Sequence, residues 1–155
     1  MLLRDLPTRA LSVRAPWDFA ILEMGKPVEN RKRSHRFRGL VFIHTSSWWK
    51  ESEVAEDRDF AEEVARRTLP DRWPADRHLP LSDLTPRLGR ITGMVEVADC
   101  VAVSDSPWFF GPVGFTLRNP VIFKNPVQCK GALGFFPVPE SIRAAVAQAE
   151  GFANA

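Results

Sequence analysis

The stretch Gly25-Lys26-Pro27-Val28-Glu29-Asn30-Arg31 places two cations and a carboxylate in a short run that should be extended. Pro27 disfavours helical backbone at the residue before it, so an extended chain is expected from Lys26 onward. Side chains alternate along a strand, and Glu29 and Arg31 therefore share one face. The pattern indicates either a surface ion pair or an oriented pair in which Glu29 fixes a guanidinium or accepts from a ligand.

Regular elements are expected on both sides of this stretch. Upstream, Leu11-Ser12-Val13-Arg14 alternates apolar and polar residues like a half-buried strand, and a short helix is predicted over 16–24. Downstream, residues 39–46 read as a buried strand with His44 near its end. His44 is expected either to be a hydrogen-bonded structural histidine or to line a pocket beside Trp48.

The rest of the chain reads as short strands and helices around one core. We expect an arm over 1–10, helices over 50–69 and 139–150, an irregular excursion over 70–88, and strands over 90–103, 113–118, 121–124 and 132–138. About six strands and three helices in this order indicate an α+β barrel and not a doubly wound sheet. A chain of 155 residues without a composition break suits a single domain over 1–155.

Composition indicates an ordinary globular protein. Hydrophobic residues make up 45% and charged residues 26%, and the formal net charge is only +2, so a polyanion would have to meet a local patch. Cys100 and Cys129 lie in apolar runs and are expected to be free thiols in a reducing cytoplasm. No metal-ligand spacing and no apolar run of membrane-spanning length occurs, so we predict a soluble protein without metal or cofactor.

One basic run stands out in this nearly neutral chain. Arg31-Lys32-Arg33-Ser34-His35-Arg36-Phe37-Arg38 is its densest group of cations. Such a run suits either a solvated loop or contacts with phosphates. The candidate contacts to a nucleic-acid backbone are Lys32, Arg33, Arg36 and Arg38.

Aromatic residues are the second unusual feature, with five Trp, eleven Phe and no Tyr. Trp17 and Trp48 flank the charged stretch, and Trp108 lies in the turn-rich loop 104–112. For any single Trp, core or rim packing is the ordinary interpretation. A cluster of Trp beside cations also suits a surface on which bases stack.

Glu96 is the odd residue on its face of the strand predicted over 90–103, between Met94 and Ala98. A carboxylate in that position lies either in solvent at a barrel rim or beside a cation. A partner such as Lys26 or Arg31 would make Glu96 a site residue.

The order of the motifs resembles the ASCH domain, a small β-barrel related to PUA domains. The similar segments are L-S-x-R-x-P-W at 11–17, G-K-x-x-E-x-R at 25–31, R-G-x-x-x-I-H at 38–44, G-F-x-L-x-N at 114–119 and the closing segment 128–136. The resemblance implies a cleft that binds RNA or a modified base. Some ASCH proteins are hydrolases, either amidohydrolases acting on acylated cytidine or ribonucleases.

The catalytic residues of that amidohydrolase group carry over only in part. Lys26 matches its lysine, but Glu29 stands where the group has a nucleophilic threonine, and Glu96 is a candidate for its glutamate. Since an acylated carboxylate is an activated anhydride, water activated by Lys26 with Glu29 or Glu96 as general base is the simpler mechanism. For phosphodiester cleavage, a carboxylate or His44 would take the 2′-hydroxyl proton.

Three functions therefore remain open at the level of sequence. The first is a binding module for RNA or a modified nucleoside. The second is a metal-independent hydrolase that uses Lys26 with Glu29 or Glu96, and the third is a module that binds another protein. The candidate ligand-binding residues are Trp17, Arg14, Arg31, His44, Trp48, Trp108 and Asn30.

Overall fold

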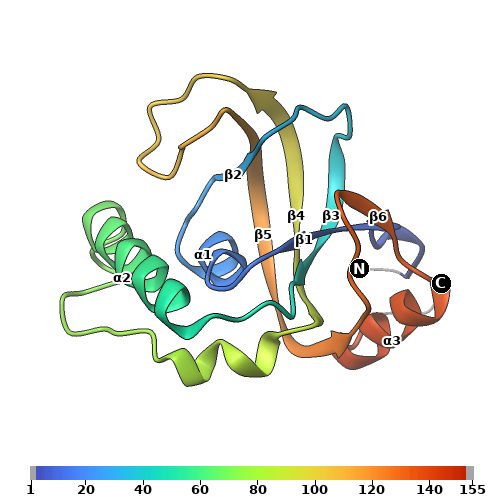
Figure 1. Ribbon diagram of the computed structural model, residues 1–155. Coiled ribbons are helices and arrows are strands. Elements are labelled where there is room, and N and C mark those ends of the chain that lie inside the picture. Colours follow the sequence, from blue (N-terminus) through green and yellow to red (C-terminus); the bar gives the residue numbers. More distant parts are fainter. Residues whose placement is uncertain (1–2, 153–155) are drawn as a thin grey trace.

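The computed structural model describes residues 3–152, and it confirms the α+β prediction. Figure 1 shows a curved sheet with α2 on one side and α3 near the chain ends. Over the described range the strands are β1 Arg9–Val13, β2 Val28–Arg31, β3 Gly39–Thr45, β4 Arg90–Val101, β5 Val113–Gln128 and β6 Phe135–Pro137. The helices are α1 Trp17–Glu23, α2 Glu51–Thr68 and α3 Glu140–Glu150, with 3-10 turns at Leu3–Asp5, Leu81–Asp83 and Thr85–Arg87.

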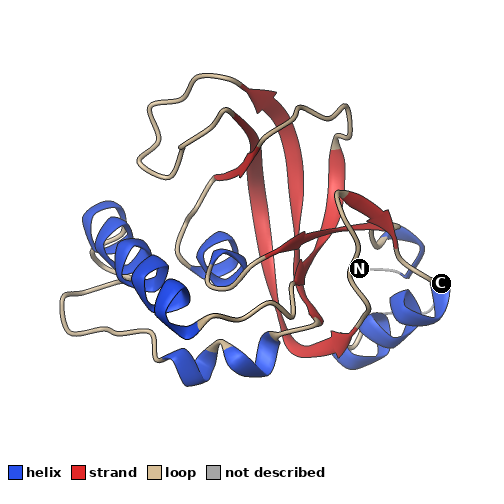
Figure 2. Cartoon of the chain, viewed as in Figure 1, coloured by secondary structure: helices blue, strands red, loops and turns tan. Residues whose placement is uncertain are grey.

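The six strands form one mixed sheet in the order β2-β5-β4-β3-β1-β6. β1 and β3 pair in parallel, while the other neighbours are antiparallel. The sheet curls into a half-barrel whose edge strands are β2 and β6 (Figure 2). The two edge strands do not pair with each other, and residues of both line the candidate site.

Irregularities between β4 and β5 accompany the curvature. Their pairing shifts register at three places, and such bulges bend a sheet and increase its twist. Asn119 adopts a positive φ of 55° beside Pro120, inside one continuous strand. The prediction of separate strands over 113–118 and 121–124 is therefore wrong, because the Asn-Pro pair forms a bulge instead of a turn.

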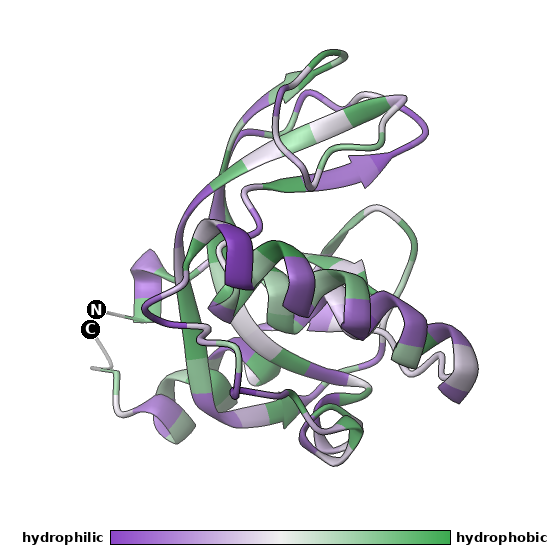
Figure 3. Cartoon of the chain, turned by 90° about the vertical axis from the view of Figure 1, so that its left-hand side faces the viewer, coloured by the Kyte–Doolittle hydropathy of each residue, from purple (hydrophilic) through white to green (hydrophobic). Residues whose placement is uncertain are grey.

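Helix α2 has the polarity that its sequence predicts. Glu51 and Glu53 lie in its first turn and Arg66 and Arg67 in its last, as the helix dipole favours. Figure 3 shows hydrophilic and hydrophobic residues distributed along this helix. Its apolar side packs into a core cluster with α1 and the segment that follows α2.

The excursion over 70–88 is not a plain surface connection. It contains two 3-10 turns and contributes the buried side chains of Trp73, Leu79 and Leu84 to the core. Arg87 donates to the buried carboxylate of Asp18 at 2.8 Å and so fastens the excursion to α1. The number of apolar residues in this segment could have indicated from the sequence that part of it is buried.

The expected arm over 1–10 is also packed against the fold. Strand β1 begins at Arg9, Leu6 is buried, and Arg143 of α3 donates hydrogen bonds to the carbonyls of Leu3, Leu6 and Pro7. Residues 1 and 2 of that arm lie outside the described residues.

At the other end of the chain, β6 is shorter than the strand expected over 132–138, so 129–134 forms a loop. Between residues 3 and 152, no helix combines the length and the apolar character needed to cross a membrane.

Candidate functional site

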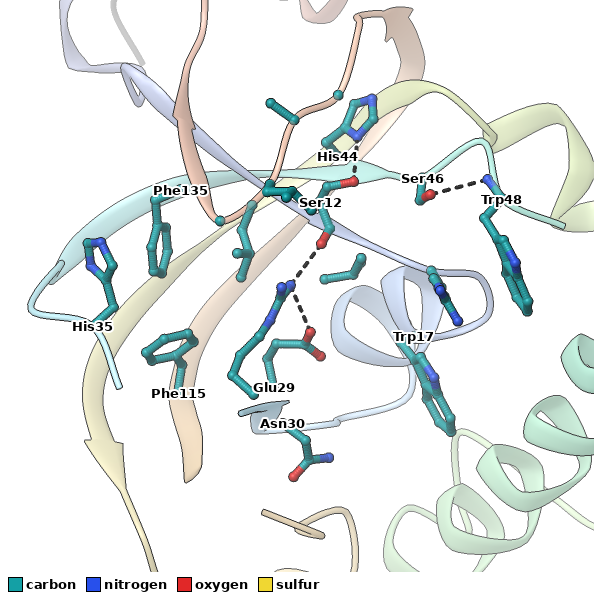
Figure 4. Close-up of a pocket in the computed structure, with 18 of the residues that line it drawn as sticks. Ser12, Trp17, Glu29, Asn30, His35, His44, Ser46, Trp48, Phe115 and Phe135 are labelled. Atoms are coloured by element: carbon teal, nitrogen blue, oxygen red, sulfur yellow. Dashed lines mark hydrogen bonds and ion pairs between the residues drawn. The ribbon is translucent and has the colours of Figure 1, made fainter. Parts of the chain in front are cut away.

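A cavity of about 1510 Å³ opens where the half-barrel fails to close. Both edge strands line it, together with β1, the end of β3 and the loop 129–134. In Figure 4, Trp17 and Trp48 lie on one side of Ser12 and Glu29, and His35, Phe115 and Phe135 lie on the other. The predicted site residues that line the cavity are Arg14, Trp17, Glu29, Asn30, Arg31, Lys32, Arg33, His44 and Trp48.

Strand β2 places the charged side chains of Glu29 and Arg31 on the cavity wall. The prediction that Glu29 and Arg31 share a face is confirmed, because Arg31 Nη2 lies 3.0 Å from Glu29 Oε2. Lys26 Nζ lies 3.1 Å from the other oxygen, Glu29 Oε1. The carboxylate is therefore held between two cations, and its side chain is only 10% exposed.

Lys26 itself lies behind the cavity wall. Its side chain is 3% exposed, and its ammonium lies 5.1 Å from the centre of the Trp17 ring. The backbone reaches this position through Gly25, whose φ is +72°, after α1 has ended. Lys26 therefore does not line the cavity directly, although it contacts Glu29 and Trp17, which do.

A chain of polar contacts continues from Glu29 along the wall. Arg31 Nη2 donates to the backbone carbonyl of Ser12 at 2.8 Å, and Ser12 Oγ lies 2.9 Å from His44 Nδ1. His44 Nε2 lies 2.7 Å from the carbonyl oxygen of Cys129. We call Lys26, Glu29, Arg31, Ser12, His44 and Cys129 the polar chain; Figure 4 draws its contacts from Glu29 to His44.

The histidine and cysteine of the polar chain are shifted toward their neutral forms. Burial lowers the pKa of His44, and hydrogen bonds with the backbone of Cys129 and Gly89 oppose that effect without cancelling it. Burial raises the pKa of the Cys129 thiol. His44 is thus a hydrogen-bonded histidine that also lines the cavity, so both interpretations of the sequence hold in part.

Two of the three predicted stacking tryptophans border the cavity. Trp17 and Trp48 are partly exposed, and the Arg14 guanidinium lies 4.2 Å from the centre of the Trp48 ring. Trp108 is 2% exposed and packs edge-on against Phe60 of α2. Its assignment as a stacking surface is wrong, since the aromatic loop folds it into the core.

Asn30 borders the cavity, but its side-chain amide forms hydrogen bonds with the backbone of the loop 108–111. It donates to the carbonyl of Trp108 at 3.0 Å and accepts from the N–H groups of Phe110 and Gly111 at 2.8 and 3.1 Å. In Figure 4 its side chain points away from Glu29. Since the amide oxygen and one of its two N–H donors are engaged, Asn30 positions this loop.

Glu96 does not join the site. Its carboxylate accepts from Arg118 Nε at 2.8 Å, and neither Lys26 nor Arg31 is its partner. Hydrogen bonding to Arg118 is the main cause that lowers the pKa of Glu96. Glu96 is absent from the cavity wall, so its proposed catalytic role and its pairing with Lys26 or Arg31 are wrong.

The residues of the basic run 31–38 line two different cavities. Lys32 and Arg33 line the main cavity, whereas Arg36 and Arg38 border a smaller one of about 640 Å³ beside Cys100. Arg38 donates to the carbonyls of His35 and Phe37. Arg38 is therefore partly committed to holding the turn of its own loop.

Sequence reasoning missed Ser12, Ser46, Phe115, Phe135 and most of the loop 129–134 as cavity residues. The polar position of Ser12 in a strand of alternating residues was an available signal. Phe135 could not be placed, because its partners His35 and Phe115, with ring centres at 4.8 and 5.2 Å, are distant in sequence.

Neither the models of known protein families nor the curated proteins give a match to this chain. Within 3–152, no three His, Cys, Asp or Glu side chains gather closely enough to hold a metal ion.

Proposed function

We propose that the cavity binds a nucleobase of single-stranded RNA or of a modified nucleoside. The observation that carries this proposal is the Glu29 carboxylate, held between Lys26 and Arg31 on a wall bordered by Trp17 and Trp48. Recognition of unstacked bases combines an aromatic surface with hydrogen bonds to the base edge. The indoles supply the surface, Glu29 supplies an acceptor, and Arg31 supplies donors.

Cations at the cavity support binding of the phosphates next to that base. Arg14, Lys32 and Arg33 line the same cavity as the two tryptophans. Its volume of about 1510 Å³ exceeds the roughly 300–1,000 Å³ of a typical small-molecule pocket. This size favours a nucleotide within a strand over a free nucleoside.

We also propose an ASCH-like assignment for the chain. The half-barrel with flanking helices agrees with the fold that the motif resemblance implies, and Glu29 in G-K-x-x-E-x-R lies on the cavity wall. Cys100 and Cys129 are both free thiols, which supports a reducing compartment such as the cytoplasm.

A titration of intrinsic Trp fluorescence with a short mixed-sequence single-stranded RNA tests the binding role. Trp17→Ala should weaken binding by about 5- to 150-fold, since stacking of one base contributes about 1–3 kcal/mol. Lys124→Ala, which removes a cation outside the cavity, is the matched control and should keep the wild-type affinity. Lys32→Ala and Arg33→Ala should each reduce the salt dependence of binding by about one unit of slope.

The same samples separate binding from hydrolysis. Binding that depends on Trp17, with RNA and acylated cytidine recovered intact, is the expected result. Product formed with EDTA present and lost in Lys26→Ala would replace the binding role with the hydrolytic one. An absence of RNA affinity in the wild-type protein would reject both and leave the protein-interaction role.

A further inference from the structure

Ser12 and His44 form a pair that the proposed binding role does not use. They are directly opposite each other in the parallel pairing of β1 and β3, so both side chains lie on one face of the sheet. Ser12 Oγ lies 2.9 Å from His44 Nδ1, and both residues line the cavity. Ser12 is partly exposed there, whereas His44 is buried.

The contacts of His44 fix which ring nitrogen carries the proton. The carbonyl of Cys129 can only accept, so the bond of 2.7 Å to Nε2 requires that Nε2 carry the hydrogen. In the neutral ring, Nδ1 is then an acceptor, and the Ser12 hydroxyl must donate to it. The hydroxyl proton of Ser12 thus already points at a base.

Packing holds the imidazole in this orientation. A Cβ atom added at Gly131 would lie 2.6 Å from His44 Cε1, so the backbone of the loop 129–134 rests against the ring. The ring of Phe136 lies edge-on at 5.7 Å. A nucleophile, a base and a group that orients the base are the three parts of a nucleophilic catalytic site.

The electrostatic setting suits proton acceptance. Burial lowers the pKa of His44, so the ring is neutral at pH 7. Among the charged and titratable groups near His44, Arg90 of β4 is opposite Thr45 and donates to the Pro126 carbonyl, and Lys130 and Cys129 belong to the loop that packs on the ring. Arg9 of β1 and Glu96, Asp99 and Cys100 of β4 lie farther along the strands that flank β3. Arg31 is anchored at the Ser12 carbonyl by a hydrogen bond of 2.8 Å and lines the cavity, so it brings a positive charge to the serine.

We propose that Ser12 and His44 are the nucleophile and general base of an acyl-transfer site that hydrolyses carboxylic esters. Ser12 Oγ attacks the ester carbonyl carbon while its proton passes to His44 Nδ1, and the carbonyl electron pair becomes an oxyanion beside Arg31. Collapse of this intermediate breaks the bond to the alcohol, which leaves with the proton from Nδ1. Water then adds to the acyl-serine with His44 again accepting the proton; the carboxylic acid departs, and the proton returns to Ser12 Oγ.

Ester hydrolysis would share the cavity and Arg31 with nucleobase binding, but its test needs no RNA. A fluorophosphonate labels only activated serines, and mass spectrometry of peptides from the labelled, folded protein locates the label. We expect the label on Ser12. Ser46, whose Oγ accepts from the Trp48 N–H at 3.1 Å, lines the same cavity without a histidine partner and should stay unlabelled.

Two measurements distinguish a catalytic histidine from a structural one. His44→Gln, checked for folding by circular dichroism, should slow labelling and hydrolysis of p-nitrophenyl acetate by about 10²- to 10⁴-fold. In the wild-type protein the labelling rate should stay level from pH 9 to pH 7 and fall only below pH 6.5, because protonated His44 cannot accept the serine proton. The Ser52→Ala variant, which changes an exposed serine of α2 outside the cavity, should behave like the wild-type protein in both assays.

Three results would overturn the proposal. The first is folded protein that carries no label on Ser12 after prolonged exposure. The second is equal labelling of Ser12 and Ser46. The third is a labelling rate that follows hydroxide concentration across the whole range with no inflection below pH 7. Since the pH profile uses the wild-type chain, it decides the matter even where His44→Gln does not fold.

Discussion

Glu29 and Glu96 are two strand carboxylates in similar pairings but in different surroundings. Each forms an ion pair with an arginine: Glu29 Oε2 lies 3.0 Å from Arg31 Nη2, and Glu96 Oε2 lies 2.8 Å from Arg118 Nε. The Glu29 side chain is 10% exposed and has Lys26 as a second partner, while the Glu96 side chain is 27% exposed and lies outside the cavity. Pairing alone therefore does not distinguish the two carboxylates; burial, a second cation and an adjoining cavity do.

The largest effect should come from removing Glu29. Glu29→Ala leaves the ammonium of Lys26 buried without its partner, and the loss of one member of a buried pair costs about 3–5 kcal/mol. Urea unfolding of the purified variant measures this cost. The double variant Lys26→Met, Glu29→Leu should recover most of it, because apolar replacement of a buried ion pair is often neutral. A loss below about 1 kcal/mol in Glu29→Ala would show that water reaches Lys26.

Asn30, the neighbour of Glu29 that faces the other way, should give the next largest effect. Asn30→Ala removes the partner of two backbone N–H groups and one carbonyl in the loop 108–111. These hydrogen bonds are part-buried or exposed and contribute about 0.5–1.5 kcal/mol each, so the free energy of unfolding should fall by about 1–3 kcal/mol in total. RNA affinity should change less than in Trp17→Ala. Equal losses of affinity would instead place the Asn30 amide in contact with the ligand.

Acidification should destabilise the protein in two steps, the first from the buried His44 and the second from the surface residue Glu96. The pKa of His44 is lowered, so its stabilising contribution is complete above about pH 6.5 and is lost as the pH falls through the lower folded-state pKa. The pKa of Glu96 is also lowered, chiefly by its hydrogen bond with Arg118, so its contribution is lost only below about pH 4.5. Urea unfolding from pH 8 to pH 3 should resolve the steps. His44→Gln should remove the upper one, and an unchanged profile in that variant would contradict the assignment.

The smallest effect belongs to the surface pair. Exposed ion pairs contribute little to stability, so Glu96→Gln should leave the urea midpoint of unfolding close to that of the wild-type protein. RNA affinity and ester hydrolysis should both stay at the wild-type level, since Glu96 lies outside the cavity wall. A decrease in RNA affinity or in ester hydrolysis of more than about threefold would show that Glu96 contributes to the site.

The local sequence pattern was sufficient to predict the features that depend on residues close together in the sequence. The shared face of Glu29 and Arg31 follows from the alternation of a strand, and the buried strand ending near His44 follows from its apolar run. The α+β class follows from the order of the elements. These properties are set within a few residues.

Long-range contacts account for the errors. The chain alone does not reveal that Cys129 accepts from His44, 85 residues away, or that Trp108 packs against Phe60. The apolar run Ala132-Leu133 suggested a strand, yet Gly134 adopts a φ of +67° there and Leu133 is 98% exposed. Apolar residues favour strands, but the tertiary structure can override this preference, and here the run lies in a loop.

The pairing of β1 with β6 has a consequence for how the protein folds. Arg9 is opposite Pro137, so the edge strand β6 joins the sheet through β1, the strand that carries Ser12 and lies far from β6 in sequence. Contacts between remote segments require large loops to close first, and they slow the search for the native state. The cavity should therefore be among the last parts to form during refolding, after β4 and β5 have paired. A chain interrupted before residue 135 would hold most of the sheet but lack the wall on which Phe135 lies.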